Sequence, residues 1–148
     1  MLRQFLRKLT QPEQQQIDDS VSVEIATAVL MVEVAHADHD FSDADSEVVM
    51  RELERSFGID ASASRSVLTD AIALHERHVS FHDIVRLLNR EVVPESRVTL
   101  LKALWRVALS DQVVHRYEEG QIRKIADWLY IPHRDFIRSK LDVQEERA

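Results

Sequence analysis

The chain repeats itself, because one stretch of its first half returns 73 residues later in its second half. The segment Val34–Asp38 (V-A-H-A-D) aligns with Val107–Asp111 (V-A-L-S-D), and Asp45 aligns with Glu118. In both copies an apolar helical stretch ends in an aspartate, and an acid follows seven residues later at the start of a second amphipathic stretch. Self-similarity at a fixed spacing indicates one supersecondary unit built twice. We therefore expect two similar helical hairpins packed about a pseudo-two-fold axis.

Helical signals also mark the elements of the first copy. Residues 22–37 are apolar on nearly all sides, which predicts a helix at the centre of the fold. Ser42 is placed as the N-cap of the next helix, with Asp45 completing a capping box, and Gly58 is the predicted left-handed residue that ends it. No stretch alternates with period two for long enough to indicate a strand.

Five further helices are predicted beyond Gly58. Their predicted starts are Ser62 or Ser64, Ser80, Pro94, Arg116 and Pro132. The last helix is expected to be short and to run through Phe136, Ile137 and Leu141. The fold class is therefore all-α, a compact bundle of seven to eight helices built from two similar halves. Its expected core contains Val29, Leu30, Leu101, Leu104, Trp105, Ile122 and Ile125.

Length and composition agree with a single helical domain. The chain has 148 residues, the size of one domain, with only two glycines and three prolines. It contains no cysteine, which excludes disulfides and thiolate chemistry. We expect an N-terminal amphipathic segment over residues 1–19, the helical domain over 20–141 and a tail over 142–148.

Charge is divided unevenly along the chain. The net charge is −7, and residues 11–60 carry thirteen acids against two arginines, whereas residues 97–140 sum to +4. This balance argues against a nucleic-acid partner, because phosphate contacts need clustered Lys and Arg. No secretory signal or bilayer-length apolar stretch is visible, so a cytoplasmic location is expected. The basic amphipathic face of residues 1–9 either contacts an anionic membrane or docks on the domain itself.

The densest group of candidate metal ligands follows the first apolar helix, and the second copy adds two acids. The candidate ligands are His36, Asp38, His39, Asp40, Asp45, Asp111 and Glu118. Carboxylates with imidazoles suit Zn, Mn or Ni, and carboxylates alone suit Mg or Ca, so the ion's identity stays open. The alternative is that the acids cap helices. Asp38 and Asp111 lie near helix C-termini, where an anion needs either N–H groups or a cation.

Two further groups of polar residues stand in apolar stripes. His75, His78 and His82 lack the glutamate of a metalloprotease motif. They are predicted to be partly buried structural histidines, because His75 and His78 continue an apolar helical stripe. Glu33, which the repeat aligns with Arg106, either pairs with it near the axis or reaches the acidic loop or solvent. No catalytic constellation stands out, so no enzymatic activity is expected.

The repeat and its surroundings resemble a known family. The stretches LMVEVAHADHDFSDADSEVVMRELERSFGI and LLKALWRVALSDQVVHRYEEGQIRKIADWLYI are similar to the TerB family of tellurite-resistance-associated proteins. The resemblance covers residues 20–140 and implies a helical bundle in two similar halves. It also implies a bacterial stress-response module that binds a divalent cation through acidic residues and meets a partner at the inner membrane face. The family's usual Asp-Gly in the hairpin loop is absent, since His39 and Gln112 stand there.

Three hypotheses about function follow. The first is a cation-binding module that docks on a protein partner. The second is a metal-free interaction scaffold whose acidic face recognises a basic protein segment. The third, which the sequence supports least, is a metal-dependent hydrolase that uses His36 with Asp38. The oligomeric state is open.

Overall fold

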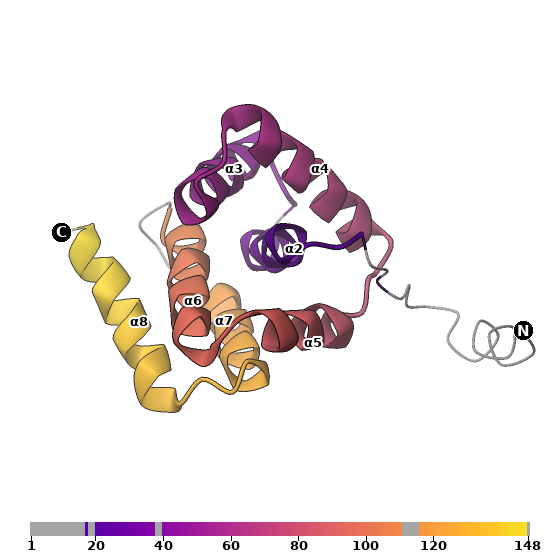
Figure 1. Cartoon of the computed structure of the whole chain (residues 1–148). Coiled ribbons are helices and arrows are strands. Elements are labelled where there is room, and N and C mark those ends of the chain that lie inside the picture. Colours follow the sequence, from indigo (N-terminus) through magenta and orange to yellow (C-terminus); the bar gives the residue numbers. More distant parts are fainter. Residues whose placement is uncertain (1–16, 18–19, 38–39, 111–115, 148) are drawn as a thin grey trace, which may run out of the picture.

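The computed structural model describes residues 17, 20–37, 40–110 and 116–147 (Figure 1). The regular structure of this part of the chain is entirely helical, which confirms the all-α prediction. The helices are α2 (Val23–Ala35), α3 (Asp43–Phe57), α4 (Ala61–Glu76), α5 (Phe81–Glu91), α6 (Pro94–Ala108), α7 (Arg116–Trp128) and α8 (His133–Glu146). Most of the predicted N-terminal amphipathic segment lies outside the described residues.

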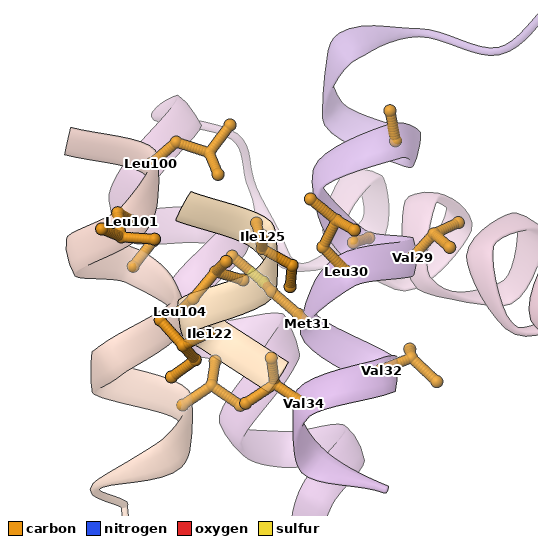
Figure 2. Packing of buried hydrophobic residues seen from close by; sticks show 14 of the residues in the cluster. Val29, Leu30, Met31, Val32, Val34, Leu100, Leu101, Leu104, Ile122 and Ile125 are labelled. Atoms are coloured by element: carbon orange, nitrogen blue, oxygen red, sulfur yellow. The ribbon is translucent and has the colours of Figure 1, made fainter. Parts of the chain in front are cut away.

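Helix α2 lies at the centre of the bundle (Figure 1). It packs against α3, α4, α5, α6 and α7, and nearly every residue from Ala26 to Ala35 is buried. A helix that is apolar on all sides has no face to offer to water, so it takes the central position, as predicted. The predicted core residues all belong to one buried cluster that α2 shares with α6 and α7 (Figure 2).

Capping residues set most of the helix boundaries. The Ser42–Asp45 capping box opens α3, Gly58 ends it at a φ of 63°, and Ser80 caps α5, all as predicted. The predicted start of α4 at Ser62 or Ser64 is wrong. The Asp60 side chain caps this helix by accepting from the Ala63 N–H at 2.8 Å. Asp caps as well as Ser does, and Asp60 is the earlier of the available capping residues.

Helix α8 differs most from its prediction. It continues to Glu146, through residues that were predicted to form a tail, and it buries Phe136, Ser139 and Val143. Ile137 and Leu141, two of the apolar residues that marked this helix in the sequence, are 39% and 44% exposed. The reason is that the indole N–H of Trp105 donates to the Ser139 hydroxyl at 3.0 Å. A serine therefore belongs to the buried face, and hydrophobic periodicity does not detect it.

The repeat proves to be a unit of three helices, α2–α4 in the first half and α6–α8 in the second. Helices α2 and α6 end 73 residues apart, α3 and α7 begin 73 apart, and α4 and α8 begin 72 apart. Packing follows the same rule, because α2 packs on α4 and α7 as α6 packs on α8 and α3. This is the contact pattern of a pseudo-two-fold relation. Helix α5 is inserted between the halves and packs on α2.

Candidate metal site at the junction of the two halves

The two acids that the repeat aligns, Asp45 and Glu118, line one pocket of about 200 Å³. The pocket lies where the C-terminal ends of α2 and α6 meet the first turns of α3 and α7. Its lining residues are Ala35, Ala44, Asp45, Val48, Val107, Ala108, Ser110 and Glu118. Ala35 and Ala108 are also aligned by the repeat, so the two halves contribute equivalent residues to one site.

Asp45 is oriented by the capping box that starts α3. The Ser42 N–H donates to Asp45 Oδ2 at 2.9 Å, the Ser42 hydroxyl donates to the same oxygen at 3.0 Å, and the Asp45 N–H donates to the Ser42 hydroxyl at 3.2 Å. A carboxylate is favourable in the first turn, where free N–H groups carry partial positive charge. The predicted capping role of Asp45 is therefore confirmed, and this cap also holds the carboxylate at the pocket.

Glu118 occupies the equivalent place in the first turn of α7 but is more deeply buried, with only 5% of its surface exposed. A carboxylate removed from water must be hydrogen-bonded or paired with positive charge. The apolar side chains around it lower the local dielectric constant, which strengthens any interaction with a cation. The site thus joins a half-buried carboxylate from one half with a buried carboxylate from the other.

The structure brings together only part of the predicted ligand set. Asp38, His39 and Asp111 lie outside the described residues, and Asp40 is exposed. His36 is not among the pocket residues, because its ring packs edge-on against His75 at 5.6 Å between centroids. Within the described residues, no group of three or more His, Asp or Glu side chains is arranged to hold a metal. The metal site therefore stays a prediction.

The pocket has a third polar residue, Ser110, which the sequence analysis did not select. The repeat aligns Ser110 with Ala37, so only the second half supplies a hydroxyl at this position. The sequence could have identified Ser110 by its position, because it lies two residues after Ala108, the aligned alanine that ends α6. Among the described lining residues, the polar side chains are thus two carboxylates and one hydroxyl, and all three offer oxygen atoms as metal ligands.

Glu33 and Arg106 do not meet, so the predicted pair is wrong. Glu33 Oε2 lies 2.6 Å from His75 Nε2, and Gln121 donates to Glu33 Oε1 at 3.1 Å. Glu33 therefore also does not end in the acidic loop or in open solvent. The physical reason is that a two-fold axis places equivalent residues at equal distances from it without bringing them together. Glu33 meets residues of α4 and α7, and Arg106 meets residues of α8 and α3.

The three predicted structural histidines have different environments. His75 is partly buried against Glu33, as expected, with 19% of its side chain exposed. His78 and His82 are exposed, so the prediction is wrong for both. Helix α4 ends at Glu76, and His78 follows it with a φ of 55°. His82 lies on the outer side of α5, because its neighbours Ile84 and Val85 form the buried face.

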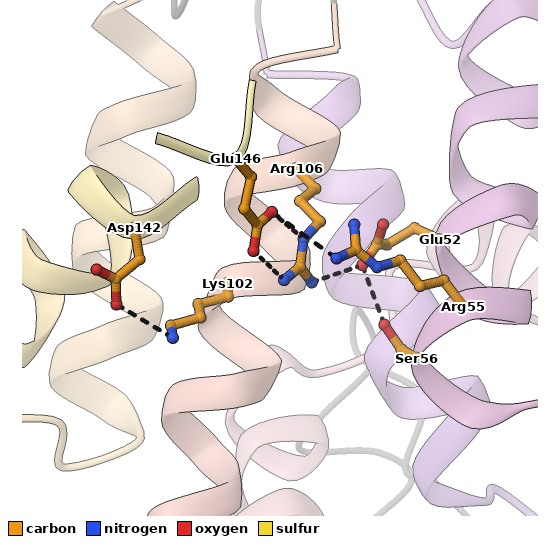
Figure 3. Close-up of polar contacts among 7 residues, drawn as sticks. All are labelled: Glu52, Arg55, Ser56, Lys102, Arg106, Asp142 and Glu146. Atoms are coloured by element: carbon orange, nitrogen blue, oxygen red, sulfur yellow. Dashed lines mark hydrogen bonds and ion pairs between the residues drawn. The ribbon is translucent and has the colours of Figure 1, made fainter. Parts of the chain in front are cut away.

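Arg106, near the C-terminal end of α6, is the centre of a charged cluster (Figure 3). Its Nε and Nη2 atoms each donate to a Glu146 oxygen at 3.0 Å, and its Nη1 atom donates to Glu52 at 3.0 Å. The hydrogen bond to Glu146 is the largest factor that raises the pKa of Arg106 above its usual value. The same hydrogen bond lowers the pKa of the Glu146 carboxyl. Sequence analysis missed this cluster because it placed Glu146 in a tail.

Comparison with known proteins gives a match at the level of a protein family. No curated protein and no solved structure matches the chain. None of the described helices is long and apolar enough to cross a membrane. A family model described as "Tellurite resistance protein TerB" matches residues 24–141, a range that contains α3 to α7 and every residue that lines the pocket. Since this match extends over most of the chain and agrees with the repeated helical units, the chain belongs to the TerB family.

Proposed function

We propose that this TerB-family protein is a bacterial stress-response module that holds a divalent cation in the pocket between its halves and docks on a protein partner. The observation that carries the proposal is the convergence of Asp45 and Glu118 on one small pocket. Two carboxylates that face the same pocket repel each other, and a cation between them removes that repulsion. We further propose a cytoplasmic location, with the partner at the inner membrane face that the family resemblance implies.

The donor atoms favour a hard cation. Asp45, Glu118 and Ser110 offer carboxylate and hydroxyl oxygens, which suit Mg, Ca or Mn better than Zn. Asp38 and Asp111 remain candidates to complete the ligand set. A bound ion would supply a fixed positive charge that joins the first turns of α3 and α7 and so links the two halves.

Thermal unfolding of metal-stripped protein tests this function. A ligand at about 100 times its dissociation constant stabilises the folded state by about 2.7 kcal/mol. In a domain of this size that corresponds to a rise of about 5–10 °C in the unfolding midpoint. We expect this rise with Mg, Ca or Mn, a smaller one with Zn, and its loss in Glu118→Gln.

A matched variant separates metal binding from helix capping. Ser42→Ala removes the hydroxyl of the capping box but leaves the Asp45 carboxylate in place, so it lowers stability by about 1 kcal/mol and keeps the metal-induced rise. Asp45→Asn should lower the stability and also abolish the metal-induced rise in the unfolding midpoint. If no ion moves the midpoint of the unaltered protein by more than about a degree, the cation proposal fails.

The second candidate function is a metal-free scaffold with an acidic recognition face. One observation favours it, because the capping box accounts for the position of Asp45 without a cation. Asp43 and Glu47 are exposed one turn apart on α3 and extend the acidic surface. A basic partner captured by this face should bind more weakly as salt rises, since exposed charges more than about 8–10 Å apart are screened at physiological salt. Charge reversal at Asp43 and Glu47 should abolish the capture.

A further inference from the structure

The outward face of α8 carries apolar side chains that the described part of the chain leaves exposed. Ile137 and Leu141 are 39% and 44% exposed, on the side opposite the buried Phe136, Ser139 and Val143. Helical spacing places five exposed residues on this side. We call them the α8 outward face, which consists of Arg134, Ile137, Arg138, Leu141 and Glu145. In Figure 1, α8 lies at the edge of the bundle beside α6.

The pseudo-symmetric counterpart of α8 provides an internal control. Helix α4 occupies the same place in the first half, and the 72-residue offset aligns Arg65 and Thr69 with Ile137 and Leu141. Both α4 residues are exposed, and both are polar. The same position in the fold therefore tolerates a polar outer face. The apolar pair on α8 consequently needs an explanation other than packing within the described part of the chain.

The charges at the two ends of this face oppose the α8 macrodipole. Arg134 lies in the first turn and Glu145 in the last, where an acid and a base, respectively, are the favourable residues. Neither residue makes an ion pair within the described part of the chain. Glu146, by contrast, is held by Arg106, which fixes the C-terminal end of α8 against α6.

The same face of a second copy, in antiparallel orientation, would cover the exposed apolar pair and also pair the terminal charges. When two α8 helices lie antiparallel and centred between Ile137 and Leu141, each Ile137 meets the Leu141 of the second copy. Arg134 and Glu145 lie about 7.5 Å and about 9 Å from this centre on opposite sides, so each Arg134 then falls within about 1.5 Å, along the axis, of the Glu145 of the second copy. The two macrodipoles also oppose each other favourably. We propose that the α8 outward face pairs antiparallel with the same face of a second copy of this chain to form a weak isologous dimer.

The first test measures the mass of the full chain against concentration. Sedimentation or light scattering from about 5 μM to about 500 μM should show the average mass rising towards that of a dimer, the range in which small interfaces associate. Ile137→Glu with Leu141→Glu should keep the protein monomeric throughout. The matched control, Arg65→Glu with Thr69→Glu on α4, should dimerise normally. A monomer at every concentration overturns the proposal, and so does a dimer that the α8 variant leaves intact.

Charge reversal tests the antiparallel arrangement. Arg134→Glu alone and Glu145→Arg alone should each weaken association at least about tenfold, because each brings like charges together twice. A mixture of these two single variants should form a heterodimer, since every facing pair is again of opposite sign. The double variant on one chain should likewise recover dimerisation. If the mixture stays monomeric while the unaltered protein dimerises, the antiparallel pairing is overturned.

Discussion

Glu33 and Arg106 occupy equivalent positions on the two inner helices, α2 and α6, and carry opposite charges. Glu33 is held by His75, near the end of α4, and by Gln121 of α7. Arg106 is held by Glu146, near the end of α8, and by Glu52 of α3 (Figure 3). Each half thus fastens its first helix to its third helix and to the second helix of the other half, with the signs reversed. Duplicated packing therefore preserves the position of a polar contact without preserving its chemistry.

The second half should depend more strongly on its charged residue than the first. Arg106→Met leaves Glu52, with 9% of its side chain exposed, without its guanidinium partner. Removal of one member of a buried pair costs about 3–5 kcal/mol. We expect a loss of about 3 kcal/mol in the free energy of unfolding by denaturant titration. Adding Glu52→Gln to this variant should recover part of the loss, and no recovery would mean that Glu52 is not the residue left unsatisfied.

The corresponding change in the first half should cost about half as much. Glu33→Gln keeps the acceptor for Gln121 but removes the negative charge beside His75, so we expect a loss of about 1.5 kcal/mol. Both Glu33 and His75 keep about a fifth of their side chains exposed, at 21% and 19%, so water compensates in part. A double-mutant cycle of Glu33→Gln and His75→Leu measures the pair. A coupling energy equal to that of Arg106 and Glu52 would contradict the difference between the halves.

Substitutions at the residues that end α3 and α7 should change the stability in opposite directions. Gly58 and Tyr130 both have left-handed backbones, with φ of 63° and 57°. Gly58→Ala should cost about 1 kcal/mol from backbone strain alone, because an added Cβ meets no atom within 4 Å. Tyr130 is 79% exposed, and its change to glycine should instead stabilise the folded protein by about 0.5–1 kcal/mol. Loss of stability in Tyr130→Gly would show that its side chain supports the fold.

The smallest expected effect is a pH dependence of the interaction between Arg106 and Glu146. The hydrogen bond from Arg106 lowers the pKa of Glu146 below 4.5 in the folded protein. The contribution of the ionised Glu146 carboxylate to stability is thus fully present above about pH 4.5. It is lost as the pH falls through the lower pKa that Glu146 has in the folded protein. Because Glu146 is 39% exposed, this contribution is at most about 1 kcal/mol. The stability difference between the unaltered protein and Glu146→Gln should shrink between about pH 5 and about pH 3. A difference that stays constant over this range would contradict the shift.

The candidate pocket illustrates how far a repeat can predict a site. The alignment of Asp45 with Glu118 identified the two acids, and both line the same pocket. It does not reveal that Ser110 joins them while His36 packs against His75. Those outcomes depend on the rotation of α2 and α6 about their own axes, which is set by packing against neighbouring helices.

The sequence by itself determined the features that depend on neighbouring residues. The apolar residues around all sides of α2, the Ser42–Asp45 capping box and the left-handed stop at Gly58 act within one or two helical turns. The tertiary structure alone decided the long-range partners. Glu33 meets Gln121 across 88 positions, and Trp105 draws Ser139 into the core and so turns Ile137 outwards. A helical period states which side of a helix is apolar, but the partner of a polar side chain is chosen only when distant helices pack together.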